Sequence, residues 1–179
     1  GSFTNAATSA NFTIGGGVTN SGVFSPATVS ISGSFSNSAT FTAGAGTVTL
    51  KGANSSLTSG GSSFNNLTII SSAIYSALDS LSVSGALGVE GTLKVKNGIT
   101  MSGTFTSTAG VMEFSGTAVQ TVPQPPGGAS YHDLHIENTI AVVSLGGDIT
   151  VFGVISIGIS ANFNAQAYTV NLIGNWTND

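Results

Sequence analysis

One ten-residue phrase recurs through this chain and constrains the fold more than any other feature of the sequence. Its copies stand at residues 169–178 (TVNLIGNWTN), at 28–37 (TVSISGSFSN) and, more loosely, at 98–107 (GITMSGTFTS). Each copy is an alternating segment followed by Gly, a small or polar residue, an aromatic residue and a hydroxyl residue. The glycines lie 70 and 71 residues apart, at Gly33, Gly103 and Gly174. A spacing this regular indicates a structural repeat.

The repeat divides the 179 residues of this single repetitive β domain into four parts. Residues 1–32 form a partial repeat, 33–102 the first full repeat, 103–173 the second, and 174–179 the start of another. Segments within the two full repeats match each other, with 111–114 corresponding to 47–50 and 131–137 to 64–70. These offsets, 64 and 67 residues, indicate that the copies differ by small insertions in loops.

Apolar residues alternate with polar ones in many short segments, as in strands that bury one face. No segment keeps apolar residues at the three- and four-residue spacing of a helix. Stacking satisfies such a repeat best, because each coil then buries its apolar side against the next. The sequence therefore predicts an all-β fold, a parallel β-helix (β-solenoid), right-handed by default, with about three strands per coil and about seven coils. The alternative is a series of β-sandwich or jelly-roll repeats.

Parallel stacking also places like residues above one another in successive coils. Asn and Gly suit the turns between strands, because both tolerate left-handed backbone conformations. We therefore expect Asn ladders and aromatic stacks inside the solenoid and at its corners. Phe35, Phe105 and Trp176 each follow a repeat glycine by two residues and are predicted to form one aligned position.

Charged residues make up only 6% of the chain, against about 25% in typical domains. Three Lys and no Arg cannot form the basic patch that phosphates or an anionic membrane surface require, which excludes nucleic acid as a partner. No run approaches the roughly 18 consecutive apolar residues of a membrane-spanning helix, so no membrane span is expected. The surface must be built from Ser, Thr, Asn and Gly, which favours an extracellular or cell-surface location. The absence of Cys does not decide the compartment.

The phrases GNWTN, GTVTLKG, FNNLTI and LSVSGALGV resemble the repeats of very large bacterial extracellular proteins, the adhesin and filamentous-haemagglutinin-like β-helix surface proteins. The resemblance covers essentially the whole chain, although the motifs are of low complexity. It implies surface display, adhesion or fibre building, and it carries over no catalytic residues. Members of that group run to many hundreds of residues and carry secretion and anchoring parts, which are not found in this sequence.

The one cluster of ionisable residues lies at 131–137 (YHDLHIE). On a strand, Asp133, His135 and Glu137 share a face, and such a carboxylate and imidazole row could hold a divalent metal. The matching residues of the first repeat are Asn66, Thr68 and Ile70, so an exposed polar strand face is the favoured interpretation.

The same segment also offers a possible ligand strip for a glycan or a receptor. The strip consists of Tyr131, His132 and His135, because aromatic rings beside polar groups suit stacking on sugars. Nearby, residues 123–128 (PQPPGG) predict a loop that leaves the body, because Pro cannot donate to a sheet ladder.

Enzymatic activity is not expected, and neither is a cofactor. A polysaccharide-degrading enzyme, the minor alternative, would need paired carboxylates or a Lys or Arg base in a groove. The carboxylates are instead scattered one per segment, at Asp79, Glu90, Glu113 and Asp148.

Thr-x-Thr pairs at 40–42, 47–49 and 104–106 raise the question of an ice-binding array. The second repeat replaces Thr47 and Thr49 by Val111 and Glu113, and this mismatch favours ordinary strand-surface threonines.

The favoured function is structural: a subunit or section of an extracellular fibre, sheath or adhesin stalk. Copies of the marker phrase stand near both ends, as GSFTN and GNWTN, with no polar or helical cap beside them. An uncapped solenoid leaves backbone groups and apolar positions open to pairing. We therefore expect head-to-tail assembly of the chain with itself, through Phe3 of one copy and Trp176 of another. The alternative is a surface module that binds glycans or a receptor.

Overall fold

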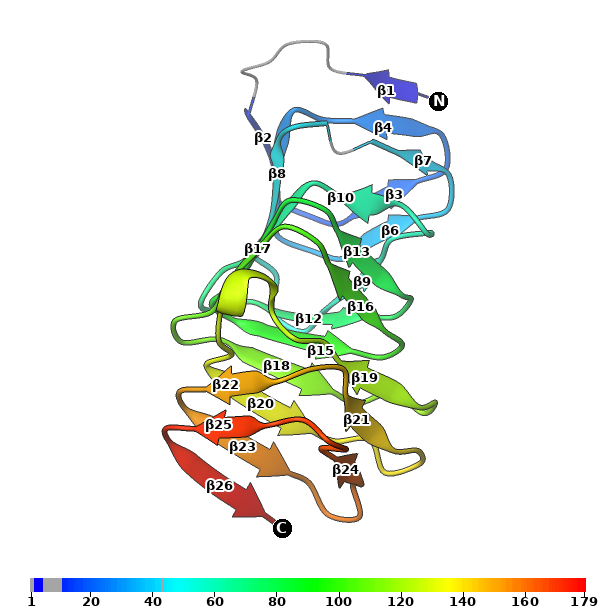
Figure 1. Ribbon diagram of the computed structural model, residues 1–179. Coiled ribbons are helices and arrows are strands. Elements are labelled where there is room, and N and C mark those ends of the chain that lie inside the picture. Colours follow the sequence, from blue (N-terminus) through cyan, green and yellow to red (C-terminus); the bar gives the residue numbers. More distant parts are fainter. Residues whose placement is uncertain (1, 5–10, 43) are drawn as a thin grey trace.

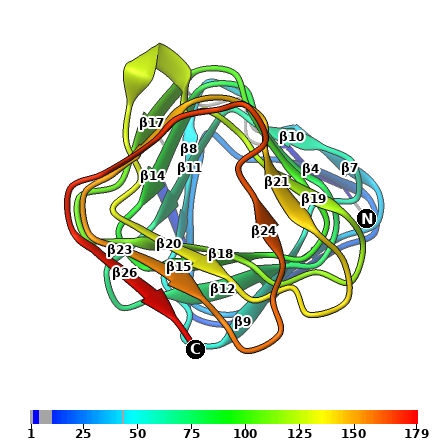
Figure 2. The ribbon, with the colours of Figure 1, turned by 60° about the horizontal axis from the view of Figure 1, so that its bottom comes forward.

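Short alternating segments wind the chain into a β-solenoid with three strands per turn (Figure 1). The computed structural model describes residues 2–4, 11–42 and 44–179, without the side chains of residues 2–4 and 11. Every strand pairing among the described residues is parallel and joins one turn to the next. A view along the axis shows a three-sided section (Figure 2). The predicted all-β parallel solenoid is therefore confirmed.

Each side of the solenoid is one stack of strands, and we name the three sides faces A, B and C. Face A holds β2 (Asn11–Ile14), β5 (Thr28–Ile31), β8 (Thr47–Leu50), β11 (Asn66–Ile69), β14 (Ala86–Val89) and β17 (Thr104–Thr106), followed by β22 (Ile149–Val151) and β25 (Val170–Leu172). Face B holds one nine-stranded sheet: β3 (Val18–Asn20), β6 (Phe35–Asn37), β9 (Ser55–Thr58), β12 (Ile74–Ala77), β15 (Thr92–Val95), β18 (Val111–Phe114), β20 (Asp133–Ile136), β23 (Val154–Ile157) and β26 (Asn175–Asn178). Face C holds β1 (Ser2–Thr4), β4 (Val23–Ser25), β7 (Thr40–Phe41), β10 (Ser63–Phe64), β13 (Leu81–Val83), β16 (Ile99–Met101), β19 (Gln120–Val122), β21 (Val143–Leu145) and β24 (Phe163–Asn164).

The nine strands of face B define about nine turns, so the predicted number of about seven is too low. Residues paired in adjacent turns are 17 to 23 positions apart in the sequence. Val18 and Phe35 show the shortest separation, and Gln120 and Val143 the longest. Strands of two to four residues with short corners make each turn smaller than the sequence pattern indicated.

The 70-residue spacing of the phrase is not a whole number of turns of this length. Copies of the phrase therefore do not lie above one another in the solenoid. Phe35 lies on β6 of face B, where its partner is Leu57, whereas Phe105 lies on β17 of face A. Trp176 lies on β26 of face B and pairs with Ile155. The prediction that these three aromatic residues share one aligned position is therefore wrong.

The core consists of columns of inward side chains that repeat from turn to turn. On face B one column runs through Tyr75, Leu93, Met112, Leu134 and Ile155, all of which are fully buried. Aromatic rings cluster in the core, but in tilted and edge-to-face contacts rather than in the expected stacks, and between other residues than predicted. Four phenylalanines pack with ring centroids 5.1 to 5.9 Å apart near the N-terminal end: Phe24, Phe35, Phe41 and Phe64.

A polar ladder occupies the corner between faces B and C, where buried backbone groups need partners. The Asn20 amide donates to Asn37 Oδ1 at 2.7 Å, and the Asn37 amide donates to the Ser59 carbonyl at 2.7 Å. Further along the axis, the Asn138 amide donates to the Ala118 carbonyl at 2.7 Å and to Gln120 Oε1 at 3.1 Å. The expected Asn ladder at a corner is present.

The Pro-rich segment forms the predicted loop and interrupts face A. It contains the 3-10 turn η1 (Pro126–Gly128), in which Gly127 and Gly128 adopt positive φ values of 67° and 72°. The turn projects from one corner of the triangular section (Figure 2). The six-stranded sheet of face A ends at β17 as a result, and only an isolated bridge, Tyr131 with Val151, connects the loop's end to β22.

The Tyr75 hydroxyl ties together three turns of the solenoid. It donates to the Gly33 carbonyl at 2.7 Å and accepts a hydrogen bond from the Gly52 N–H at 3.1 Å. A Cβ atom at Gly52 would lie 2.8 Å from this hydroxyl, so a glycine is required there.

We expect Tyr75→Phe to lower the free energy of unfolding by about 1–3 kcal/mol, because the buried Gly52 N–H loses its acceptor. Tyr168→Phe is the matched control, since its side chain is 42% exposed and its hydroxyl has no partner among the described residues. Denaturant unfolding followed by circular dichroism measures both variants. Equal stability of the two would contradict the structural role of the Tyr75 hydroxyl.

Candidate functional site

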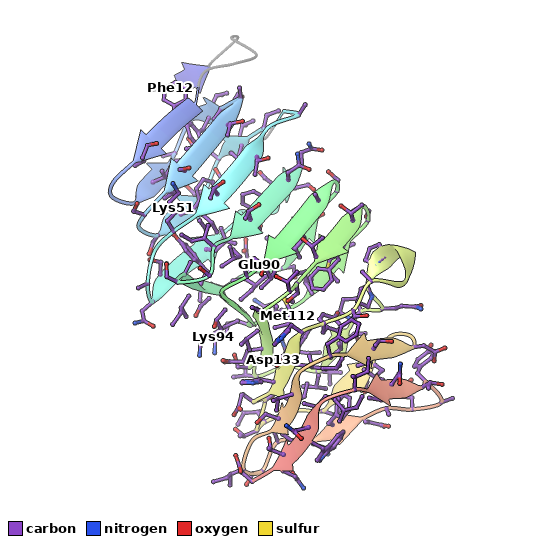
Figure 3. All side chains as sticks on the ribbon, turned by 90° about the vertical axis from the view of Figure 1, so that its left-hand side faces the viewer. Phe12, Lys51, Glu90, Lys94, Met112 and Asp133 are labelled. Atoms are coloured by element: carbon purple, nitrogen blue, oxygen red, sulfur yellow. The ribbon has the colours of Figure 1, made fainter. Side chains whose placement is uncertain are left out.

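Three ionisable side chains of face B form one outward column near the middle of the solenoid. Lys94, Glu113 and His135 are direct neighbours on β15, β18 and β20. Lys94 Nζ lies 2.8 Å from Glu113 Oε2, and Glu113 is only 9% exposed. Figure 3 labels Lys94 on this part of the solenoid. Lys94 and Glu113 carry opposite charges on adjacent turns, and their attraction can stabilise the stacking of these turns.

The predicted metal-binding residues alternate as the sequence indicated. Asp133, His135 and Glu137 are half-buried on the outer surface, while Leu134 and Ile136 are fully buried. The carboxylates of Asp133 and Glu137, however, contact residues of the adjacent turn.

Asp133 Oδ1 accepts a hydrogen bond from the Val154 N–H at 2.7 Å and lies 3.1 Å from His132 Nδ1. The Glu137 carboxylate packs over Gly158, whose missing side chain leaves room for it. The described part of the chain brings no three His, Cys, Asp or Glu side chains together in a way that could hold a metal ion.

Tyr131 belongs to the core rather than to a ligand strip. It is fully buried, its ring centroid lies 5.2 Å from that of Phe105, and its hydroxyl donates to the Pro123 carbonyl at 2.6 Å. Burial raises the pKa of the Tyr131 phenol far above its usual value, so the hydroxyl remains a donor. The prediction that this ring stacks on a ligand is wrong, and only His132 and His135 of the predicted strip are partly exposed.

The sequence contained a signal for this burial that the strand pattern concealed. Tyr131 ends the segment that crosses face A and β20 of face B begins at Asp133, so His132 marks the corner between the two faces. Both Tyr131 and Leu134 are buried although three positions separate them, which a continuous strand does not allow. The Tyr131 hydrogen bond instead anchors the Pro-rich loop to the solenoid.

A shallow hollow of about 230 Å³ lies beside the Pro-rich loop on face A. Its lining comes from three separate segments: Gln124, Gly128, Ala129, Asp148, Ile149, Thr150, Thr169 and Asn171. Asp148 Oδ1 accepts a hydrogen bond from the Thr169 N–H at 2.7 Å and so links two turns. No sequence pattern indicated this hollow, because its residues meet only through the stacking of turns.

The last described turn exposes positions that are buried one turn earlier. Trp176 is 51% exposed, although its partner Ile155 on β23 is fully buried. A hollow of about 430 Å³ lies beside it, with Ile157 and Phe163 among its lining residues. The strands β24, β25 and β26 each pair along one edge only. The other predicted interface residue, Phe3, has its backbone on β1 beside Phe24, but its side chain lies outside the described residues.

Comparisons with protein-family models, with curated proteins and with solved structures find no match for this chain. Within the described ranges, no helix has the length and apolar character that crossing a membrane requires.

We expect Lys94→Met to lower the free energy of unfolding by about 1–3 kcal/mol, because the nearly buried Glu113 carboxylate loses its cation. Lys51→Met is the matched control, since the Lys51 side chain is exposed and has no partner among the described residues. Thermal and denaturant unfolding measure the difference.

The double variant Lys94→Met with Glu113→Met should recover most of the lost stability, because apolar side chains can replace a buried ion pair. If Lys94→Met behaved like Lys51→Met, the column of charges would have no role in stacking.

Proposed function

We propose that this chain is a structural section of an extracellular fibre, sheath or adhesin stalk that grows by stacking one solenoid on the next, head to tail. The observation that carries the proposal is the in-register stacking of all three faces, by which the last described strands, β24, β25 and β26, offer free edges to a further turn from this chain or from another copy. On β25, Val170 and Leu172 are only partly buried, whereas their partners Ile149 and Val151 are 3% and 0% exposed. In the preceding turns, the corresponding inward positions are covered by the next turn of the solenoid.

The physical driving force for such stacking is the one that joins the turns within the chain. A second copy laid on the open end would pair with the free edges of three strands and complete their ladders. An aromatic side chain buries about 200 Å², so covering the exposed half of Trp176 removes about 100 Å² from water and contributes about 2.5 kcal/mol. Because the next copy offers the same open end, the contact does not close and a filament results.

The low charge of the chain supports both assembly and an extracellular setting. With 6% charged residues and a net charge of −4, little repulsion opposes the stacking of identical copies. The interface would consist of backbone hydrogen bonds and apolar contacts, so added salt should not dissolve it. The faces of such a rod carry mainly uncharged Ser, Thr and Asn side chains, which suit a spacer in contact with water on all sides.

Placing a charge in the proposed interface tests the assembly. We expect Trp176→Asp to shorten the filaments or abolish them, because an unpaired carboxylate cannot be buried without a large free-energy cost. Phe3→Asp should act at the opposite end of the chain. Sedimentation velocity and electron microscopy measure particle length.

Ile140→Asp is the matched control, because Ile140 is 72% exposed at a corner one turn before β24 and the substitution adds the same charge. Three results would reject the proposal: monodisperse single particles of the native chain, Trp176→Asp filaments of native length, or filaments that dissolve in about 1 M NaCl.

A further inference from the structure

Face A carries a two-column array of uncharged side chains, most of them hydroxyl-bearing, on its outer surface. Strand alternation points every second residue of its six-stranded sheet outward, and parallel pairing aligns these residues from turn to turn. One column consists of Thr13, Ser30, Thr49, Thr68, Gly88 and Thr106. The other contains Thr28, Thr47, Asn66, Ala86 and Thr104. Figure 3 faces this side of the solenoid, where the strands from blue to green run parallel.

The structure removes the reason for treating these threonines as ordinary surface residues. The sequence comparison placed Val111 and Glu113 opposite Thr47 and Thr49, but both lie on β18 of face B. The true neighbours of Thr49 on adjacent turns are Ser30 and Thr68, which also bear hydroxyls.

The chemistry of the array distinguishes it from the other two faces. Neither column contains a charged or an aromatic residue, whereas face B carries Lys94, Glu113 and His135 outward. Among the described residues, none of the Thr and Ser hydroxyls of the array has a protein hydrogen-bond partner. On face C, by contrast, Ser63 Oγ lies 3.2 Å from Ser82 Oγ, so those hydroxyls already satisfy each other. The hydroxyls of face A are left to water.

The spacing of the array fits a hydrogen-bonded water lattice. Neighbouring strands lie about 4.8 Å apart, and alternate residues along a parallel strand lie about 6.6 Å apart. In tetrahedral ice with O···O distances of about 2.75 Å, second-neighbour oxygens lie about 4.5 Å apart and paired layers repeat about every 7.3 Å. The match is close across the strands and within about a tenth along them. Thr is stiff at χ1, so the array holds its hydroxyls and methyl groups in order before any ligand arrives.

We propose that face A binds the surface of ice through this two-column array. Each hydroxyl would anchor one water molecule of the lattice, and the methyl groups between them would leave the ordered layer undisturbed. A charged side chain would instead orient water around itself, and the array has none. A crystalline polysaccharide is the other ordered surface of this kind, but binding sugar rings favours exposed aromatic side chains, which these two columns lack. This binding is independent of head-to-tail assembly.

A pair of matched lysine substitutions tests the proposal. Thr49→Lys places a charge in the centre of the array on β8, while Thr58→Lys makes the same change at a half-buried outward position of β9 on face B. We expect the native chain and Thr58→Lys to concentrate in slowly growing ice and to inhibit ice recrystallisation. Thr49→Lys should lose at least several-fold in both measurements. Circular dichroism and thermal unfolding show that both variants retain the fold.

A gain-of-function variant provides a second test at the one gap in the first column. A Cβ atom at Gly88 would lie 3.5 Å from Thr106 Oγ1 and 3.7 Å from Thr68 Oγ1, which are ordinary contact distances. Gly88→Thr therefore fits and would complete the column, so the fraction of protein in the ice phase should rise above that of the native chain.

Two results would overturn the proposal. One is a native chain that enters ice no more than Thr49→Lys does. The other is retention on crystalline chitin or cellulose that depends on Thr49 without any effect on ice, which would assign the array to a polysaccharide.

Discussion

Parallel hydrogen bonding between successive turns is the interaction on which the rest of this structure depends. Each strand finds its partners one turn away, between 17 and 23 residues along the chain. Pairing of this kind fixes the register, and the register places each side chain directly above another. The stability of any turn therefore comes from its two neighbours. A turn that lacks one neighbour, such as the one containing β26, exposes side chains that are buried elsewhere.

Stacking in register explains which residues the chain can use. Inward columns are apolar, and the corner between faces B and C is a ladder in which side-chain amides satisfy backbone groups of the next turn. A charge repeated in a column would repel itself, which fits the scarcity of charges in this chain, and the two charges that meet on face B, Lys94 and Glu113, have opposite signs. Tyr75 and Tyr131 bury their rings and use their hydroxyls to tie the backbone of different segments together.

The same geometry gives the molecule two kinds of surface with different properties. The last described strands, β24, β25 and β26, each have one free edge, and their turn exposes apolar positions that are buried one turn earlier. The sides are regular along the axis, so any pattern on them lengthens with each added turn. On face A the pattern is a lattice of free hydroxyls, interrupted where the Pro-rich loop leaves the body. The proposed stacking and the proposed surface recognition would therefore use perpendicular directions of one repeat and would not compete.

The sequence alone determined the class of fold, the strand alternation, the corner asparagines and the loop at 123–128, because these depend on local chemistry and on the existence of a repeat. It did not determine which residues become neighbours. The 70-residue phrase spans more than three turns without being a whole number of them, so Phe35 and Phe105 lie on different faces and Thr49 stacks on Thr68 rather than on Glu113. Likewise, the chain bends at His132, and the Tyr131 side chain therefore points into the core. Only the tertiary structure decided these points. If a segment moves to another face or shifts by one residue, each of its side chains gains new neighbours although the local sequence is unchanged.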